Sequence, residues 1–335
     1  MSRVLFVFVD GVGLGDDDAT INPFVAARLP VLETLLDGER PLRRVAGAAT
    51  PPGNASADAP SPDRPVGGDS RDQAPSRLVA LDASLGVPGT PQSGTGQSSL
   101  LTGENTVERF GRHYGPWVPT SLRPLVRDHS VLRRAVDAGL RVAFANAYPE
   151  LLLERVRAGE NGRRLGPLRA GPPLAALGAG LLTRHAEDLR QGRAVASEIV
   201  NDGWRQRLGR TELPVVTPSE AGHNLAAIAA RNDLTLFAHY TTDYVGHRGS
   251  FHEAVKVLEG FDAFLGGVLE DLPDDVLLLI ASDHGNIEDV RVEHTQNPAF
   301  GLVCGGARDA EEPIRGLHSL MDVAGVVMEV LGAGK

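Results

Sequence analysis

The chain has 335 residues, of which 42% are hydrophobic and 23% are charged, and its formal net charge is -10. This length and balance suffice for one large core that carries an insertion. The acidic balance argues against a protein that holds nucleic acid or an anionic membrane through a basic patch. A small anionic substrate stays open, because bound cations can reverse the local electric field.

Cys304 is the only cysteine, so the chain can form no intrachain disulfide, and a metal site must use His and carboxylate ligands. The apolar run at residues 1–9 leads directly into Asp10 and Gly11 with no cleavage signal, so we expect a strand there rather than a signal peptide. No stretch is apolar over the length that a membrane helix needs. We expect a cytoplasmic protein with neither membrane nor nucleic acid as partner; its oligomeric state stays open.

The first part of the chain predicts a buried strand and several helices. Residues 3–9 are almost continuously apolar, which is typical of a central parallel strand. Residues 47–76 consist mainly of Ala, Pro, Gly, Asp and Ser and lack large apolar side chains, so we expect a flexible surface insertion there. Around them we expect helices at 30–36, 94–101 and 130–138 and a strand at 140–145.

The second part changes character at residue 148. Residues 148–212 carry Ala, Leu, Arg and Gly at helical spacing with Pro-rich breaks, which indicates a small helical cap or insertion. Afterwards we expect helices at 224–231, 252–269 and 321–331 and strands at 234–240 and 276–281. This alternation predicts an α/β fold, a doubly wound and mostly parallel sheet with helices on both faces, built from residues 1–147 and 213–335.

Three of the predicted strands lead into acidic residues: Asp10, Asp243 and Asp283. In sheets of this type, ligands bind beyond the carboxyl ends of the strands. The three carboxylates are therefore expected to meet at one edge of the sheet and to form a site.

Three histidines accompany these carboxylates. His247 follows Asp243 by four residues, His284 follows Asp283 directly, and His294 lies a little further along the chain. Taken singly, such pairs are more often a solvated helix pair or a capping turn. Together, three carboxylates and three imidazoles suit two divalent cations of the zinc or manganese kind.

The segment at residues 91–103 is rich in Gly, Ser and Thr and has two interpretations. The plain one is a serine that caps a helix behind a glycine turn. In the functional one, Ser93 is a nucleophile at a helix N-terminus, where a bound cation and the helix dipole both favour its oxygen anion. The backbone N–H groups of Gly94, Thr95 and Gly96 could then face phosphoryl oxygens.

In five segments that span most of its length, the chain resembles the alkaline phosphatase superfamily. Within it, the likeness is to the branch of cofactor-independent phosphoglycerate mutases and phosphopentomutases. The order of the segments along the chain is that of the superfamily. They are residues 9–13 (VDGVG), 93–103, 242–247 (TDYVGH), 282–286 (SDHGN) and 294–295.

The resemblance implies an alkaline phosphatase-like fold, a nucleophile and two metal positions. The nucleophile would be Ser93. One metal would be bound by Asp10, Ser93, Asp283 and His284, and the other by Asp243, His247 and His294. Two metals about 4 Å apart would clamp the attacking and leaving oxygens of an in-line displacement.

Two departures from the related families stand out. Gln97 occupies a position at which the mutases carry His, and residues 148–212 are too few for the large transferase domain of the phosphoglycerate mutases. Thr95 and Gln97 stand where sulfatases need Pro and Arg, which argues against sulfatase activity.

These features predict a two-metal phosphoryl-transfer enzyme. We expect a phosphomonoesterase or phosphodiesterase that acts on a small phosphorylated metabolite through a phosphoserine. The alternatives are an intramolecular phosphomutase, which would need a closed site that excludes water, and a metal-binding protein without activity. Candidate substrate contacts are Gly94, Thr95, Gln97, His113 and Asn146; for the last two, a surface turn and a turn cap are the alternatives.

Overall fold

The computed structural model describes residues 2–46, 76–158, 166, 168–306 and 310–334. The predicted flexible insertion at 47–76 lies outside this range, apart from Ser76. Within it, no helix combines the length and the hydropathy that crossing a bilayer would require.

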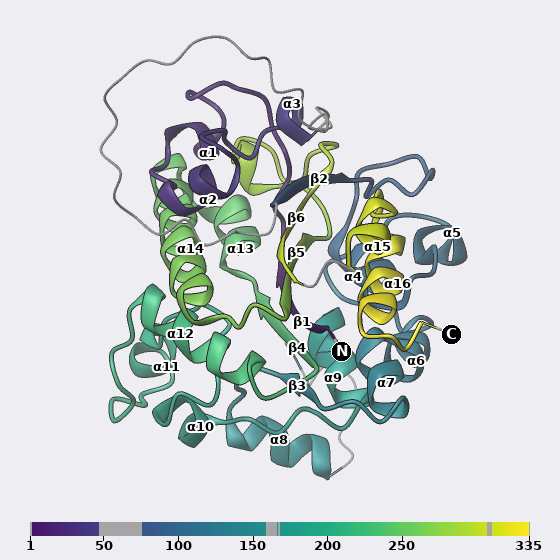
Figure 1. The fold of residues 1–335 in the computed structure, drawn as a ribbon, viewed down its shortest axis with the longest axis vertical. Helices are drawn as coiled ribbons and strands as arrows, with labels where there is room; N and C mark the ends of the chain where they lie inside the picture. The colour runs from purple at the N-terminus through teal and green to yellow at the C-terminus, as the bar shows by residue number, and fades with distance from the viewer. Residues whose placement is uncertain (1, 47–75, 159–165, 167, 307–309, 335) are drawn as a thin grey trace.

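The centre of the molecule is a six-stranded sheet with the order β2-β6-β5-β1-β4-β3 (Figure 1). The strands β5, β1, β4 and β3 are parallel, whereas β6 pairs antiparallel with both β5 and β2. The strands are β1 (Arg3–Val9), β2 (Arg77–Leu81), β3 (Val142–Phe144), β4 (Leu234–His239), β5 (Val276–Ser282) and β6 (Ala299–Gly305).

The predicted α/β class and all four predicted strands are confirmed. The antiparallel strands β2 and β6 were not predicted. β2 is only five residues long and directly follows the Pro- and Gly-rich segment. β6 contains Gly301 and Gly305, and glycine weakens a strand pattern because it offers no side chain to pack.

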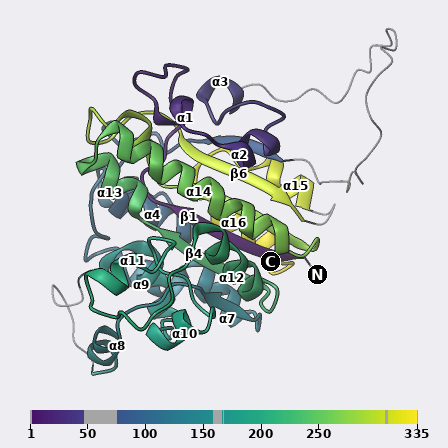
Figure 2. The same ribbon diagram turned by 90° about the vertical axis from the view of Figure 1, so that its left-hand side faces the viewer.

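Both faces of the sheet are buried, and β1 shows why. Its side chains alternate between two apolar cores, with Val4, Phe6 and Phe8 in one and Leu5, Val7 and Val9 in the other. The first core is closed by α4 (Ser93–Thr102), α7 (Val131–Asp137), α9 (Gly171–Gly178) and α16 (Leu320–Val330). The second is closed by α1 (Pro23–Ala26), α2 (Pro30–Leu35), α12 (Pro218–Ala229) and α14 (Phe251–Asp271). Figure 2 shows α14 running along the sheet.

The remaining helices are short. They are α3 (Arg43–Ala46), α5 (Thr106–Phe110), α6 (Arg123–His129), α8 (Glu150–Arg157), α10 (Ala186–Arg190), α11 (Asp202–Gln206), α13 (Thr241–Arg248), α15 (Glu311–Arg315) and the 3-10 helix η2 (Ile287–Asp289).

Helix α12 begins six residues before the predicted start at residue 224. Its start is set by a capping box in which Thr217 and Glu220 accept hydrogen bonds from each other's backbone N–H groups, with Pro218 in the first turn. This pattern stops the chain from fraying at the N-terminus of the helix. The predicted start at residue 224 is too late because it rests on the apolar residues of the helix, whereas the capping residues Thr217 and Glu220 lie before them.

The predicted cap at 148–212 is helical, but the structure divides it between two environments. Helix α9 packs against α4, α6 and α7 and contributes Leu174, Ala175 and Ala176 to the main core. The segments around α10 and α11 instead enclose a separate apolar cluster of Ala147, Ala186, Leu189, Ala194, Ala196, Trp204 and Leu213. The domain boundary itself stays a prediction. Within the predicted cap, α9 packs into the main core.

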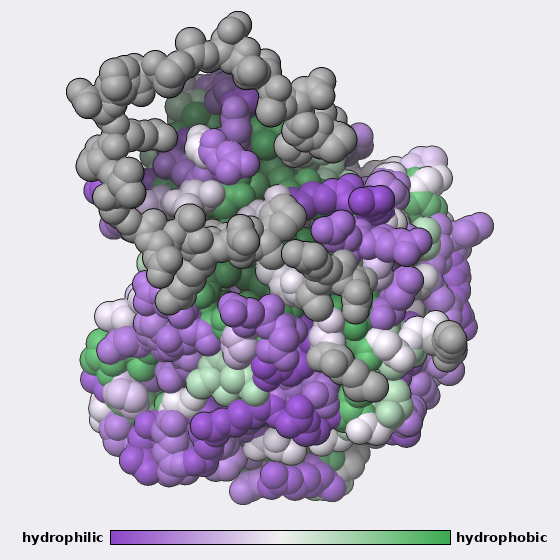
Figure 3. All heavy atoms as spheres, viewed as in Figure 1, coloured by the Kyte–Doolittle hydropathy of each residue, from purple (hydrophilic) through white to green (hydrophobic). Residues whose placement is uncertain are grey.

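The face of the molecule in Figure 3 is covered mainly by hydrophilic residues, with hydrophobic ones in scattered patches between them. Single exposed apolar side chains are ordinary on a protein surface. The apolar material of the described residues is concentrated in the two cores on either side of the sheet.

The central strand provides a test of this architecture. Phe6 is fully buried in β1, so Phe6→Ala should lower the free energy of unfolding by about 3–5 kcal/mol. Leu151 is 59% exposed, and Leu151→Ala should change it by less than about 0.5 kcal/mol. Urea denaturation followed by circular dichroism measures both. Equal losses in the two variants would contradict the assignment of β1 to the core.

Candidate metal centre and substrate cavity

The register of the sheet brings the predicted carboxylates together. Val9 of β1 lies opposite His239 of β4 and Ser282 of β5, so these three strands end at the same level. Asp10 directly follows β1, and Asp283 directly follows β5. Asp243 lies in the first turn of α13, the helix that follows β4. The edge of the sheet is therefore acidic, as the sequence predicts.

Asp10, Asp283 and His284 form the first group of potential ligands, and all three are buried. His284 Nε2 lies 3.5 Å from Asp10 Oδ1 and 3.7 Å from Asp283 Oδ2. Ser93 Oγ is 2.9 Å from the same nitrogen. The four residues that the resemblance assigns to one metal thus lie together.

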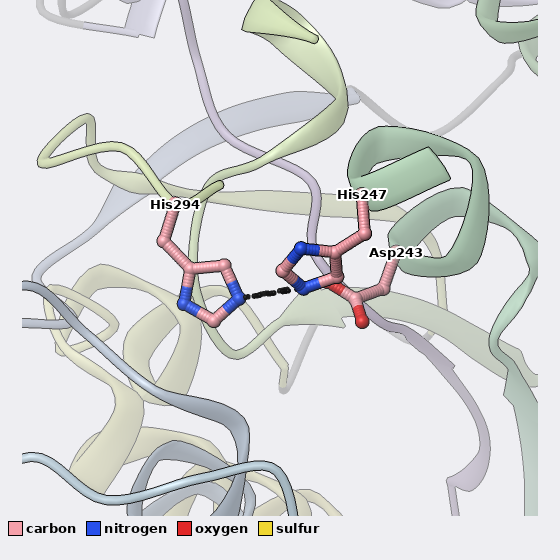
Figure 4. Close-up of side chains that lie close together, drawn as sticks. All are labelled: Asp243, His247 and His294. Atoms are coloured by element: carbon pink, nitrogen blue, oxygen red, sulfur yellow. Dashed lines mark hydrogen bonds and ion pairs between the residues drawn. The ribbon is translucent and has the colours of Figure 1, made fainter. Parts of the chain in front are cut away.

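Asp243, His247 and His294 form the second group, which reaches the surface (Figure 4). His247 Nε2 is 3.4 Å from Asp243 Oδ1 and 3.0 Å from His294 Nε2. His294 Nδ1 is 2.9 Å from the carbonyl oxygen of Pro91, to which it donates. That bond leaves the lone pair of His294 on Nε2, facing the group, as in many metal-binding histidines.

The electrostatics of the buried group fit divalent cations. Burial, followed by the charges of Asp283 and Asp243, raises the pKa of Asp10 well above its usual range. Burial lowers the pKa of His284, but the nearby carboxylates, led by Asp283, outweigh it and raise this pKa to about 10. Asp10 Oδ1 and Asp283 Oδ2 are buried and have no hydrogen-bond partner among the described residues. Cations would satisfy these oxygens and relieve the repulsion, and mixed N and O donors suit zinc or manganese.

Ser93 is the first residue of α4, a helix whose ten residues are all buried. The close fit depends on glycine, because a Cβ at Gly94 would lie 2.2 Å from the Trp117 carbonyl oxygen. The neighbouring hydroxyls are engaged elsewhere: Ser98 Oγ donates to Gly94 O at 2.6 Å, and Ser99 Oγ lies 2.9 Å from the hydroxyl of Thr106.

The backbone N–H groups at this helix start differ from the expectation. Thr95 N–H donates to Tyr114 O and Gly96 N–H donates to Gln92 O, each at 2.9 Å, so neither is free for a phosphate. Among the described residues, the N–H groups of Ser93 and Gly94 have no acceptor. These two can face an anion, since N–H groups in the first turn of a helix lack intrahelical partners.

Gln97 contacts the metal centre directly. Its Nε2 donates to Asp10 Oδ2 at 3.3 Å, and its Oε1 accepts from the N–H of Gly171 at 2.8 Å. It thereby links a predicted ligand to the start of α9. Thr95, by contrast, is turned away, and its hydroxyl accepts from Tyr114 N at 3.1 Å.

His113 and Asn146 do not line the cavity described below, and the expectation that they contact the substrate stays a prediction. His113 Nε2 donates to Val87 O at 3.0 Å. The side-chain amide of Asn146 forms two hydrogen bonds with the backbone of Ala238. Its Nδ2 donates to the carbonyl oxygen at 2.7 Å, and its Oδ1 accepts from the N–H at 2.8 Å. Asn146 therefore continues the pairing of β3 with β4.

Glu288 is the main site residue that the sequence analysis missed. It is 1% exposed and accepts from the N–H groups of Gly13 and Asn286, both at 2.8 Å. Its other oxygen accepts from the side chains of Thr295 and Asn297. One buried carboxylate thus joins the loop after β1 to both ends of the connection between β5 and β6. An acid in a turn carries no sequence signal that separates it from a surface residue.

Asn286 transmits this arrangement to the metal ligands. Its Nδ2 donates to Asp243 Oδ1 at 2.8 Å, while its Oδ1 is buried without a partner among the described residues. Side chains that donate a hydrogen bond to a metal ligand orient that ligand and affect metal affinity.

A cavity of about 740 Å³ opens above the two groups. Ser93 is the only hydroxyl of the segment at 91–103 that reaches it. The lining residues are Asp10, Gln92, Ser93, Gln97, Gly115, Pro116, Trp117, Ala170, Tyr240, Asp243, Tyr244, His247, Arg248, Glu293 and His294.

Comparison with known proteins supports a metalloenzyme. Residues 220–335 match the sequence model of the Metalloenzyme superfamily. The chain is 31% identical over 118 residues to the 2,3-bisphosphoglycerate-independent phosphoglycerate mutase 2 of Methanosarcina barkeri, covering 32% of this chain and 22% of that protein. It is 32% identical over 127 residues to the corresponding mutase of Paracoccus denitrificans, covering 35% and 24%. The alignments thus span less than a quarter of the length of these curated relatives.

Among solved structures, the protein PH0037 from Pyrococcus horikoshii aligns over 100% of this chain and 98% of its own, with a TM-score of 0.55 and 11% sequence identity. At that identity the likeness concerns the fold alone. The family match and the mutase relatives confirm the resemblance found from the motifs: the chain is similar to metalloenzymes of this superfamily. The roles of individual residues stay predictions.

Metal content tests the two groups. The protein should bind about two Mn²⁺ ions per chain, and His247→Ala should bind about one, because only the surface group loses a ligand. His113→Ala, which changes a histidine outside both groups, should still bind two. Equilibrium dialysis with metal analysis measures the stoichiometry. A single ion per wild-type chain at saturation would contradict the two-site prediction.

Proposed function

We propose that this chain is a phosphomonoesterase or phosphodiesterase that acts on a small phosphorylated metabolite through Ser93 and two divalent ions, zinc or manganese. One observation carries the proposal: a single serine hydroxyl at a helix start reaches the cavity beside two groups of three potential ligands. A nucleophile needs a means of activation within contact distance, and this arrangement supplies it.

The residues would divide as follows. Asp10, Asp283 and His284, with Ser93, would hold one ion, and Asp243, His247 and His294 would hold the other. When bound, the ions would stabilise negative charge on the serine oxygen and on the phosphate.

The chain's own groups would carry out the displacement. Ser93 Oγ gives up its proton to solvent water and bonds to phosphorus, while the bond from phosphorus to the ester oxygen breaks and the leaving oxygen takes a proton from water to form the alcohol. The N–H groups of Ser93 and Gly94 face the phosphoryl oxygens. Water then attacks the phosphoserine, the P–Oγ bond breaks, and the serine hydroxyl is restored.

Water access favours hydrolysis in this proposal. His247 is exposed, and the neighbouring Tyr244 at the cavity wall is 59% exposed, so the second group of ligands lies open to solvent. A phosphomutase must keep water away from its phosphoserine until the substrate recaptures the phosphoryl group.

An intramolecular phosphomutase is the second candidate, because the curated relatives are phosphoglycerate mutases. The two functions give different products from one substrate. Incubation with 3-phosphoglycerate and with pentose phosphates, in Mn²⁺ and in Zn²⁺, should release inorganic phosphate. An isomerised phosphate ester with no released phosphate would instead support the mutase.

Replacement of the nucleophile is the sharpest test of the proposed function. Ser93→Ala should lower kcat by at least about 1000-fold, because the covalent route is lost, while the Asp and His ligands still bind metal. Ser98→Ala, at a buried hydroxyl that points away from the cavity, should keep most of the activity. Acid quenching during turnover and peptide mass spectrometry should find phosphate on Ser93. Full turnover by Ser93→Ala would overturn the assignment.

A further inference from the structure

The cavity extends beyond the metal centre between two walls. The first wall is the loop of Gly115, Pro116 and Trp117, and the second is α13 with Tyr244 and Arg248. The Trp117 carbonyl oxygen is packed so closely against Gly94 that no larger residue fits there. The first wall is therefore fixed beside Gly94, the residue that follows Ser93.

Aromatic rings are concentrated in these walls. Phe, Trp and Tyr make up 5% of the chain, yet three of the fifteen lining residues are Trp117, Tyr240 and Tyr244. The guanidinium group of Arg169 lies 4.6 Å from the centre of the Trp117 ring and covers one of its faces. The ring of Tyr240 packs edge-on against Phe8, with centroids 6.0 Å apart. Both rings are thus held in place by neighbours. This reduces the conformational entropy that the two side chains would lose when a ligand stacks on them.

Apart from the potential metal ligands, the charged residues that line the cavity are Arg248 and Glu293. Among the described residues that line the cavity, Arg248 is the only Arg or Lys, and Glu293 balances it. The Arg248 guanidinium lies 5.5 Å from the centre of the Tyr244 ring. Arg169, which covers a face of Trp117, adds a second positive charge beside this wall, so the aromatic rings and not the charges distinguish these walls.

The size of the cavity leaves room for an organic group beyond the phosphate. A volume of about 740 Å³ lies within the range of pockets that hold drug-sized ligands, about 300–1,000 Å³. A phosphate group alone fills a small part of it. Aromatic walls provide flat apolar surfaces, on which a planar ring makes the largest contact.

We infer that the site selects phosphate esters whose alcohol carries a planar aromatic ring, as in a benzyl or a nucleoside ester, with Trp117 as the specificity-determining residue. This inference rests on the proposed function, since it names the substrate class of the same site. The phosphate lies over the metal centre, and the ring lies against Trp117.

A matched pair of esters tests the inference. Benzyl phosphate and cyclohexylmethyl phosphate have similar leaving groups and sizes, and only the first is planar. In the Mn²⁺-loaded protein, kcat/KM should be about 3- to 10-fold higher for benzyl phosphate. Trp117→Leu should bring this ratio close to one, and Trp117→Phe should keep most of it. In Trp117→Leu, kcat/KM should fall by a larger factor for benzyl phosphate than for methyl phosphate, which has no ring.

The same variants decide the alternatives. Equal kcat/KM for the two esters in the wild type, or an equal loss on all esters including methyl phosphate in Trp117→Leu, would overturn the inference. Adenosine 5′-monophosphate against ribose 5-phosphate shows whether the preference extends to nucleosides; a preference for benzyl phosphate alone would still support the aryl class.

A binding measurement keeps the inference testable if no ester is turned over, an outcome that would contradict the proposed function itself. The chain has two tryptophans, so Trp204→Phe leaves Trp117 as the only indole. Benzylphosphonate should quench its fluorescence with an affinity about 3- to 10-fold higher than that of cyclohexylmethylphosphonate. Equal affinities would contradict the stacking of a planar ring on Trp117.

Discussion

The repulsion among three carboxylates at one edge of the sheet is the constraint around which this site is built. The register of β1, β4 and β5 places Asp10, Asp243 and Asp283 together, and burial denies them the solvent that normally stabilises such charges. A cation relieves this repulsion better than protonation does, because it satisfies several oxygens at once. Metal binding and the stability of this edge are therefore expected to be coupled.

A layer of uncharged and acidic partners holds these carboxylates in place. Glu288 joins the loops that follow β1 and β5, and Asn286 carries that order to Asp243 through a hydrogen bond of 2.8 Å. On the other side of the site, Gln97 connects Asp10 to the start of α9. A potential metal ligand is thus linked to α9, a helix of the 148–212 segment that also contributes apolar side chains to the main core.

The potential metal ligands and the walls of the cavity come from different parts of the fold. Asp10, Asp283 and His284 follow strand ends, and Asp243 lies in the first turn of α13, so the sheet fixes the positions of these four potential ligands. His247 lies in the last turn of α13, and His294 lies in the connection between β5 and β6. The walls of the cavity come from the loop at 115–117 and from the outer side of α13. Loops can change without disturbing the sheet, so substrate preference can vary on a constant metal centre.

Features that depend on neighbours in the chain could be predicted from the sequence alone. The apolar runs of β1, β4 and β5, the acid after each of them, and the spacing of Asp243 and His247 are local patterns. They were sufficient to predict the α/β fold and a metal site at one edge of the sheet, whereas the division of the ligands into two groups came from the family resemblance. Tertiary structure decided what depends on distant partners. The pairing of β2 with β6, the burial of Glu288 and the capture of Asn146 by Ala238, 92 residues away, each rest on hydrogen bonds between remote segments. No local pattern specifies such bonds, because the partner is chosen only when the chain has folded.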